Sequence, residues 1–383
     1  MKKIFRMVTG LGLLGFLMTG CGIISNGNNS SNNSENTNIS SQENLPEFDG
    51  GNGTENNPYV ISKPYQWANI NIHLDSHYII QSDLNLGDIK DLSPIGNNEH
   101  PFEGFIEGNH KTISNANITV KHICGLFGVV SGGTVKNLNF EQSSLKVNED
   151  VDGDTIGSIA GLVKMGGLIE NCHTKNVTLV WESLYTKVYI GGLVGTVQSS
   201  ANVNYCSATK FIINAKTSFY PEPRYGGIIG LLDGGNLNAC WSSGNINNSH
   251  NLMNSMEGGI ACVTKWGDIK NCWSHPIFKG GSHVSTSGTI ACSVQTEEAL
   301  SYLISFAEFP GNDVTNRYYS CPDSVSYSEF INLHYSPSTI SQSNSAIDVP
   351  AWANNTKLWK KGSVHPELVS YEEFLQLTSE NKN

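Results

Sequence analysis

The stretch Gly192-Leu193-Val194-Gly195, followed by Val203-Asn204-Tyr205-Cys206, is one copy of a pattern that decides the fold. The first box recurs as Gly125-Leu126-Phe127-Gly128, Gly161-Leu162-Val163, Gly227-Ile228-Ile229-Gly230 and Gly259-Ile260-Ala261, with a degenerate sixth copy at Gly288-Thr289-Ile290-Ala291. The second box recurs as Val135-Lys136-Asn137-Leu138, Ile169-Glu170-Asn171-Cys172, Leu237-Asn238-Ala239-Cys240 and Ile269-Lys270-Asn271-Cys272. The anchor glycines lie 36, 31, 35, 32 and 29 residues apart. A period near thirty residues indicates stacked units that share one continuous core.

These units are strands rather than helices, because they are short, β-branched and punctuated by glycine, with no helical period. Stacked coils that form parallel sheets are the simplest arrangement. In the second box the apolar residue and the Cys lie three residues apart, so strict alternation would put them on opposite faces of a strand. Asn stands between them in three copies and tolerates left-handed backbone angles. A bend there returns both side chains to the interior, which predicts a corner of a solenoid.

The cysteines recur with the repeat. Cys172, Cys206, Cys240 and Cys272 share one position, and Cys262 and Cys292 share another. Stacked coils would place such equivalents about 4.8 Å apart in an apolar interior. Buried free Cys behaves as a small hydrophobic residue, so we expect an inert ladder. Disulfides between coils and a metal site remain as alternatives, although no CxxC spacing supports the metal site.

The N-terminus has the features of an export signal. Residues 1–20 combine a basic start with a short apolar run, too short for a membrane-spanning helix. The end of this run, Met18-Thr19-Gly20-Cys21, resembles the lipobox of bacterial lipoproteins, which implies lipidation at Cys21; a free thiol is the alternative. Residues 21–46 are rich in Asn and Ser and are expected to be a flexible tether. Gly22 follows the Cys where Asp often retains lipoproteins on the inner membrane, so the expected location is the cell envelope, at the outer membrane or cell surface.

The charge of the chain excludes several partners. The formal net charge is -11, and removal of residues 1–20 takes away Lys2, Lys3 and Arg6 but no acid. The remaining 20 basic and 34 acidic residues give -14. Nucleic acid and anionic lipid are therefore not expected as partners, although the lipid anchor itself would hold the chain on a membrane.

The repeat boxes resemble the GLUG-type repeats of bacterial surface and adhesin-like proteins. The same family resemblance extends to the leader Gly50–Ile61, to the segments Ser93–Gly96 and Phe102–Asn115, and to the closing Trp359–Gly362 with Pro366 and Leu368. The resemblance covers roughly residues 50–370. It implies an all-β fold, a right-handed parallel β-helix on an exported protein, with no common catalytic residues and no cofactor. The sixth copy and Lys164, where a second Gly is usual, depart from the pattern.

The resulting domain plan has five parts. Residues 1–20 are the signal and 21–46 the tether. Residues 47–120 form an N-terminal capping region with the first coils, and 121–310 the repeat solenoid. Residues 311–383 form a C-terminal capping region with a helix from Tyr371 to Glu380, because a solenoid must cover its open sheet edges.

The residues that directly follow the ladder position should point outward: His173, Ser207, Trp241 and Trp273. Trp241 and Trp273 would then lie on adjacent coils of one face, with His275 nearby. Aromatic side chains with a polar edge can stack on sugar rings, so these three residues are the candidate glycan face. The alternative is that the loops 245–255 or 280–286 cover the tryptophans as a small satellite core.

An acidic loop is a weak calcium candidate. Asn148, Asp150, Asp152 and Asp154, with Gly153 at the sixth place, follow the start of a calcium loop. The twelfth position is Ile159, where an EF-hand needs a bidentate Glu, so this is not an EF-hand. A solvated acidic loop is the alternative.

Enzymatic motifs are missing from the sequence. Pectin lyases and polygalacturonase-type hydrolases share β-helical scaffolds, but there is no GHG motif, and Arg224 and Arg317, the two arginines left after the signal, lie in no acidic motif. Glu103 and Glu107 can be nominated as a carboxylate pair without a supporting motif. We therefore expect a non-enzymatic, adhesin-like surface lipoprotein that binds glycan or host and matrix components. The alternatives are a carbohydrate-active β-helix enzyme and a structural envelope protein without a ligand.

Overall fold

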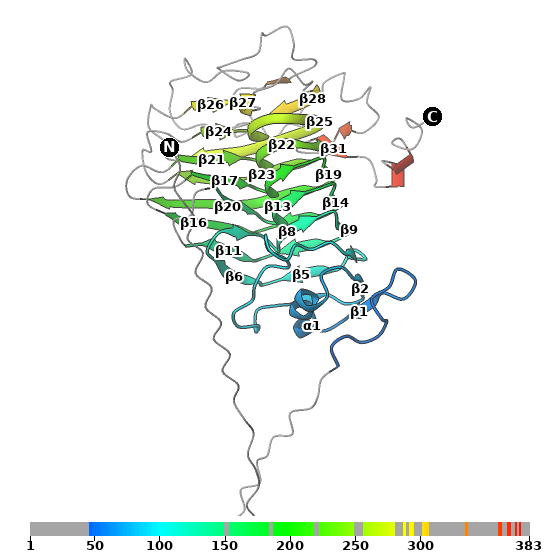
Figure 1. Cartoon of the computed structure of the whole chain (residues 1–383). Helices are drawn as coiled ribbons and strands as arrows, with labels where there is room; N and C mark the ends of the chain where they lie inside the picture. The colour runs from blue at the N-terminus through cyan, green and yellow to red at the C-terminus, as the bar shows by residue number, and fades with distance from the viewer. Residues whose placement is uncertain are drawn as a thin grey trace, which may run out of the picture. The chain divides into compact units, whose positions relative to one another are not determined.

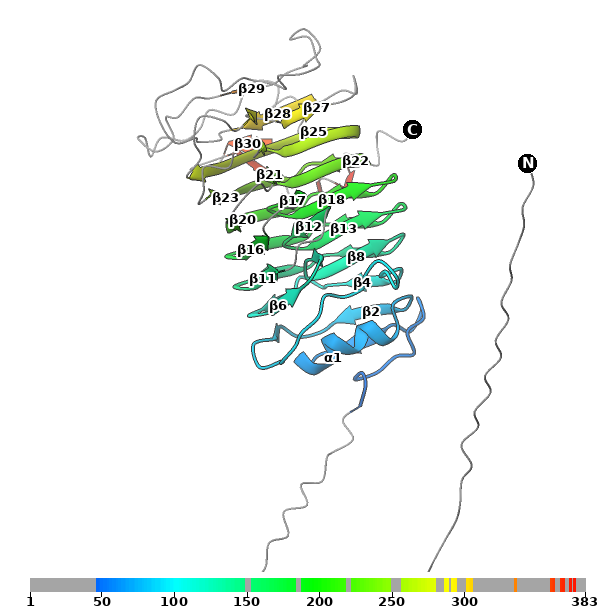
Figure 2. The ribbon, with the colours of Figure 1, turned by 60° about the vertical axis from the view of Figure 1, so that its left-hand side comes forward.

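A computed structural model describes residues 46–148, 153–183, 187–217, 222–248, 256–279, 286–288, 291–294, 301–305, 334–335, 359–361, 366–368, 372–373 and 375–376. The predicted signal, Cys21 and most of the tether lie outside these residues, as does most of the predicted C-terminal capping region. The described chain is a parallel β-solenoid of about five turns, which confirms the predicted fold class. Figures 1 and 2 show the turns stacked from β1 and α1 at one end to β27 and β28 at the other.

Each full turn contains five short strand positions, and equivalent positions in successive turns pair in parallel. We call the five sets of equivalent strands columns one to five. Column one is a six-stranded sheet of β7 (Ile123–Cys124), β12 (Asp154–Gly157), β17 (Lys187–Gly191), β21 (Glu222–Gly226), β24 (Met256–Gly258) and β26 (Thr286–Gly288). Column two contains β8 (Phe127–Ser131), β13 (Ala160–Lys164), β18 (Val194–Gln198), β22 (Ile229–Asn238), β25 (Ala261–Lys279) and β27 (Ala291–Val294).

The other three columns share strands in the later turns, where one strand continues around a corner. Column three contains β1 (Tyr59–Ile61), β2 (His77–Ile80), β4 (Phe105–Glu107), β9 (Thr134–Lys136), β14 (Leu168–Glu170) and β19 (Asn202–Asn204), continued by β22 and β25. Column four contains β3 (Leu84–Asn85), β5 (Thr112–Ser114), β10 (Asn139–Glu141), β15 (His173–Lys175), β20 (Ser207–Thr217), β23 (Trp241–Asn248), β25, β28 (Ser301–Ser305) and β29 (His334–Tyr335). Column five contains β6 (Asn117–Val120), β11 (Ser144–Val147) and β16 (Thr178–Ser183), continued by β20, β23 and β25.

A short helix closes the N-terminal end of the core. It is α1 (Pro64–Asn69), followed by the 3₁₀ turn η1 (Ile70–Ile72). Pro64 suits the first helical position, and the side chain of Gln66 accepts hydrogen bonds from the backbone N–H groups of Ser62 and Lys63, both at 2.9 Å. Trp67 is fully buried, with its ring 5.8 Å from that of Phe127. The helix therefore covers the apolar end of the first coils and lies within residues 47–120, where the sequence analysis expected a capping region but no helix.

Near the C-terminus, β30 (Trp359–Lys361) and β31 (Pro366–Leu368) form an antiparallel pair. Residues 372–373 and 375–376 are helical, within the predicted helix from Tyr371 to Glu380.

The first repeat boxes stack in one register, with two corrections to their predicted alignment. Phe127, Ala160, Val194, Ile229, Ala261 and Ala291 are successive register partners. The second copy is therefore Ser158-Ile159-Ala160-Gly161, so its position in the sequence analysis was wrong by three residues, and Lys164 lies beyond the box. The sixth copy is displaced by one residue, since Gly288 pairs with Gly258. Ser158 replaces a glycine, and its hydroxyl donates to the carbonyl oxygen of Gly192 in the next turn.

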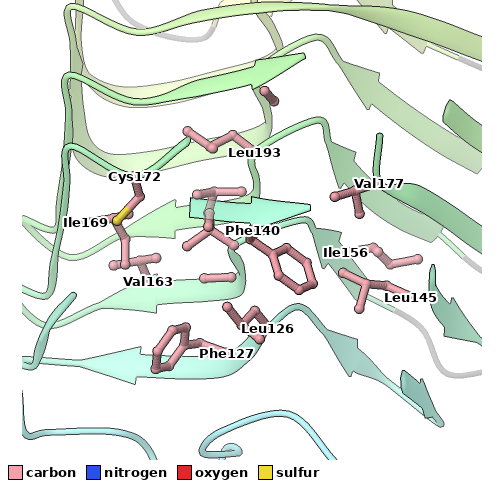
Figure 3. Close-up of a cluster of buried hydrophobic side chains, with 14 of the residues drawn as sticks. Leu126, Phe127, Phe140, Leu145, Ile156, Val163, Ile169, Cys172, Val177 and Leu193 are labelled. Carbon is pink, nitrogen blue, oxygen red and sulfur yellow. The ribbon is translucent and has the colours of Figure 1, made fainter. Parts of the chain in front are cut away.

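The predicted corner is confirmed. Asn137, Asn171 and Asn271 have φ angles of 55°, 50° and 53°, and Tyr205 and Ala239 take the same left-handed conformation at the equivalent places. Both flanking side chains consequently face inward. Figure 3 shows Ile169 and Cys172 side by side in the interior, and both are fully buried.

The ladder cysteines are free and buried. The backbone N–H groups of Cys172 and Cys206 lie 3.4 Å from the sulfur of the next ladder cysteine, and that of Cys240 lies 3.5 Å from the sulfur of Cys272. Burial raises the pKa of Cys172, Cys206 and Cys240 well above the usual value for a thiol, and that of Cys124 to about 12. Because the thiolate is the reactive form, these side chains are inert packing groups in the folded chain.

We therefore expect iodoacetamide at pH 8 to leave Cys172, Cys206 and Cys240 unmodified in the native chain and to label them in guanidinium chloride. Peptide mass mapping measures this. A disulfide-linked peptide pair among them, or rapid native labelling, would contradict the ladder.

A column of glycines allows columns one and two to approach closely at the first box. Gly157, Gly191, Gly226, Gly258 and Gly288 are successive register partners. A Cβ atom at Gly191 would overlap the carbonyl oxygen of Val194 and would lie 2.6 Å from that of Ile228. Backbone atoms on both sides leave no side chain that could move aside.

Gly191→Ala should therefore lower the free energy of unfolding by roughly 1–3 kcal/mol, the usual cost of overpacking. Gly50→Ala is the matched control, because its Cβ would meet only a Val60 methyl group at 3.8 Å. Denaturant unfolding followed by circular dichroism measures both, and equal stability of the two variants would contradict the close approach.

Candidate ligand-binding groove

The outward face of column four lies between two left-handed corners. The corner at Asn171 precedes the three-residue strand β15, and a second corner follows it at Asn176, with a φ of 55°. Each turn thus presents two outward side chains here. By backbone register, the first row of positions is Asn139, His173, Ser207, Trp241 and Trp273, and the second is Glu141, Lys175, Thr209, Ser243 and His275.

These rows border an open groove of about 380 Å³. Its lining residues are Glu141, His173, Thr174, Lys175, Ser207, Thr209, Lys210, Trp241 and Ser243. The half-buried Trp241 is the aromatic residue in this lining, and the others supply hydroxyl, imidazole, ammonium and carboxylate groups. One flat apolar surface beside many polar groups suits a sugar ring, which has apolar faces and hydroxyls along its edge.

A chain of hydrogen bonds fixes the polar wall of the groove. The pKa of His173 is lowered to about 4, mainly by burial and secondly by the charge of His110, so its imidazole is neutral at pH 7. Its Nε2–H donates to Oδ1 of Asn171 at 2.9 Å, and its Nδ1 accepts from the Ser207 hydroxyl at 2.9 Å. Asn171 donates to Asn137 at 2.7 Å, and Asn137 donates to the Glu107 carboxylate at 2.9 and 3.0 Å. The network spans successive turns and holds the imidazole in one orientation.

Two exposed lysines enter the groove from neighbouring turns. Lys175 is the register partner of Thr209, and Lys210 is the next residue along the chain. Lys210 occupies the second corner with a φ of 53°, at a β-bulge where β20 passes β23. The equivalent corner residues of the preceding turns are Asn115, Gln142 and Asn176, which also have positive φ. Lys210 therefore places a charged side chain at a backbone position that Asn or Gln occupies in the three preceding turns.

The predicted glycan face coincides with this groove in part. Trp241 lines it, and Trp241 and Trp273 are register partners on adjacent turns, as predicted. The side chain of Trp273 lies outside the described part of the structure. The half-buried His275 pairs in register with Ser243. The sequence analysis placed His173 and Ser207 on the outward face but missed Lys175, three residues after Cys172, and Lys210 at the corner.

The calcium-loop hypothesis does not fit the position of Asp154. This residue is fully buried, and its carboxylate oxygens contact Nδ1 of His122 at 2.6 Å and accept from Nε1 of Trp181 at 3.2 Å. It is therefore a core residue and not a loop ligand. Asn148 is exposed, and Asp150 and Asp152 lie outside the described residues. Within the described ranges, no group of three or more His, Cys, Asp or Glu side chains could hold a metal ion.

The nominated carboxylates Glu103 and Glu107 contact different parts of the structure. Glu107 accepts hydrogen bonds from the Asn109 backbone and from the Asn137 side chain at the first corner. Glu103 borders a separate, open pocket of about 760 Å³, whose lining does not include Glu107. The structure therefore does not bring the two nominated carboxylates into one site.

His122 also borders a pocket of about 470 Å³ beside the loop Ser93–Glu99. Its side chain is 33% exposed, whereas its partner Asp154 is completely enclosed. A buried carboxylate in the core needs such a partner, because an isolated buried charge is costly.

Comparisons with known proteins show the fold and leave the family open. No family model matches the chain, so the GLUG-type assignment stays a resemblance. A stretch of 102 residues is 36% identical to a "Putative Gly-rich membrane protein" of Evansella cellulosilytica, covering 24% of this chain and 12% of that protein. A second, of 172 residues, is 28% identical to Halomucin of Haloquadratum walsbyi, covering 39% of this chain and 2% of that protein. The chain thus spans a small fraction of the length of both relatives.

The solved structures provide a longer match. The crystal structure of a "putative immunoglobulin A1 protease" from Bacteroides ovatus aligns with a TM-score of 0.54 at 20% identity, covering 84% of this chain and 95% of that one. At this identity the likeness shows a shared fold. Among the described residues, no helix is long and apolar enough to span a membrane.

His122→Ala should lower the free energy of unfolding by roughly 1–3 kcal/mol, because the buried Asp154 carboxylate then loses its hydrogen-bond partner at 2.6 Å. His100→Ala is the control, since His100 is exposed on the loop beside the same region. Chemical unfolding measures both, and a His122→Ala variant as stable as the control would contradict the structural role of the pair.

Proposed function

We propose that the chain is a non-enzymatic surface protein that binds saccharides in the groove of column four. The observation that carries this proposal is the position of Trp241 at one end of a polar groove whose hydrogen-bonding groups are held in place. His173, Ser207 and Thr209 form that polar wall, and Thr209 donates to the carbonyl oxygen of Thr174 at 3.0 Å. A binding surface built on a stacked sheet is rigid, so little conformational entropy is lost when a ligand binds.

An exported, adhesin-like lipoprotein at the cell envelope is the second part of the proposal. The lipobox-like Met18–Cys21 and the repeat resemblance support it. The names of the two partial relatives, a Gly-rich membrane protein and Halomucin, are consistent with a membrane or surface location.

The test is binding of the purified chain to a glycan array, with matrix proteins as a second arm. Trp241→Ala should bind saccharides about tenfold more weakly or worse, which corresponds to about 1.4 kcal/mol. The matched control is Trp266→Ala, because Trp266 is 59% exposed and is not part of the groove lining.

Circular dichroism and thermal unfolding must show that both variants are folded. The proposal is contradicted if the parent chain binds no saccharide, or if Trp241→Ala binds as tightly as Trp266→Ala. Binding to matrix proteins alone, insensitive to Trp241, would also contradict it.

A further inference from the structure

The groove carries a local positive charge on a protein whose net charge is negative. The chain carries a net charge of -11, yet the charged side chains in the groove lining are Lys175, Lys210 and Glu141. Neither lysine forms an ion pair with another described residue, whereas Lys63, Lys146, Lys265 and Lys270 do. The two ammonium groups are therefore available to a ligand. Their local positive charge contrasts with the negative net charge of the chain.

Lys210 occupies the corner beside the groove in a left-handed backbone conformation that lysine does not favour. Left-handed angles are unfavourable for a residue with a long side chain and are tolerated best by Gly, Asn and Asp. The preceding turns place Asn or Gln at this corner, while Lys210 adopts a φ of 53°. Backbone strain that persists in one copy of a repeat often accompanies a functional side chain.

We propose that the groove is specific for anionic saccharides, whose carboxylate or sulfate group lies between Lys175 and Lys210 while the ring stacks on Trp241. This inference rests on the proposed function and names the ligand class of the same groove. The two lysines come from adjacent turns and are offset by one residue, so their side chains can approach one anionic group from two sides. Trp241 lies in the following turn, as the register partner of Ser207.

Glu141 restricts where the negative charge can go. It is the register partner of Lys175, on the turn farther from Trp241. A second anionic group at that end would be repelled, while sugar hydroxyls could donate to the Glu141 carboxylate. The groove therefore fits a saccharide with its charge near the lysines and a neutral, hydroxyl-rich part beside Glu141.

The experiment compares matched pairs of probes by titration calorimetry with the full chain. The pairs are 3′-sialyllactose with lactose, oligogalacturonate with its methyl ester, and 3′-sulfolactose with lactose. At least one charged member should bind about tenfold more tightly than its neutral partner at about 0.05 M salt, and this preference should shrink at about 0.5 M salt as the charges are screened. The pairs distinguish carboxylate from sulfate as the preferred group.

Two variants locate the effect. Lys175→Gln and Lys210→Asn should each reduce the preference to about threefold or less, whereas Lys164→Gln, a lysine outside the groove lining, should leave it unchanged. Lys210→Asn also tests the backbone argument, because Asn suits this corner, and its unfolding temperature should equal or exceed that of the parent. Trp241→Ala should weaken both members of a pair alike.

The possible failures are separable. Equal affinity for the charged and neutral members, or an unchanged preference in the Lys175→Gln/Lys210→Asn double variant, overturns the anionic specificity and leaves saccharide binding intact. Absence of binding by every probe overturns the proposed function as well.

Discussion

Parallel stacking without offset is the constraint on which the rest of the structure depends. Backbone groups of each strand hydrogen-bond to the equivalent strands of the turns above and below, so a turn in register with its neighbours bends where they bend. The backbone N–H groups of Asn137, Asn171, Tyr205 and Ala239 donate to carbonyl oxygens of the next turn at 2.9–3.1 Å. These bonds hold even Tyr205 and Ala239 in the left-handed conformation. Asn tolerates the left-handed conformation and establishes the corner in three turns. Hydrogen bonds to the neighbouring turns then hold residues that tolerate this conformation less well in the same backbone angles.

The same constraint produces the groove. Between the two corners a turn has room for three residues, of which the central one faces the core and the outer two point away from it. The inward residues, such as Phe140, Thr174 and Ala208, are buried and determine packing. The outward residues are free to vary from turn to turn, because changing them leaves the stack intact. The side chain at one such position therefore differs from turn to turn on an unchanged backbone: Asn139, His173, Ser207 and Trp241. This is how a repetitive fold can carry a specific site.

Much of this was predictable from local spacing. The three-residue interval with Asn predicted the corner, and the recurrent cysteines predicted the buried ladder. The second copy of the first box was misplaced because Ser158 replaces a glycine there. Its hydroxyl donates to the Gly192 carbonyl oxygen of the next turn, which the glycine pattern does not reveal. Asp154 was read as a loop ligand because its partner His122 lies in the preceding turn, and burial depends on that distant pairing. Lys210 could not be assigned to a corner without the register, since its neighbours in sequence give no turn signal.

The measurement that tests the central claim most directly is a crystal structure of the chain with a bound acidic saccharide. The account predicts a sugar ring stacked on Trp241, with its anionic group between Lys175 and Lys210 and its hydroxyls near Ser207 and Glu141. A saccharide bound instead in the pocket beside His122 and Ser93, or a Trp241 ring covered by the chain itself, would contradict it.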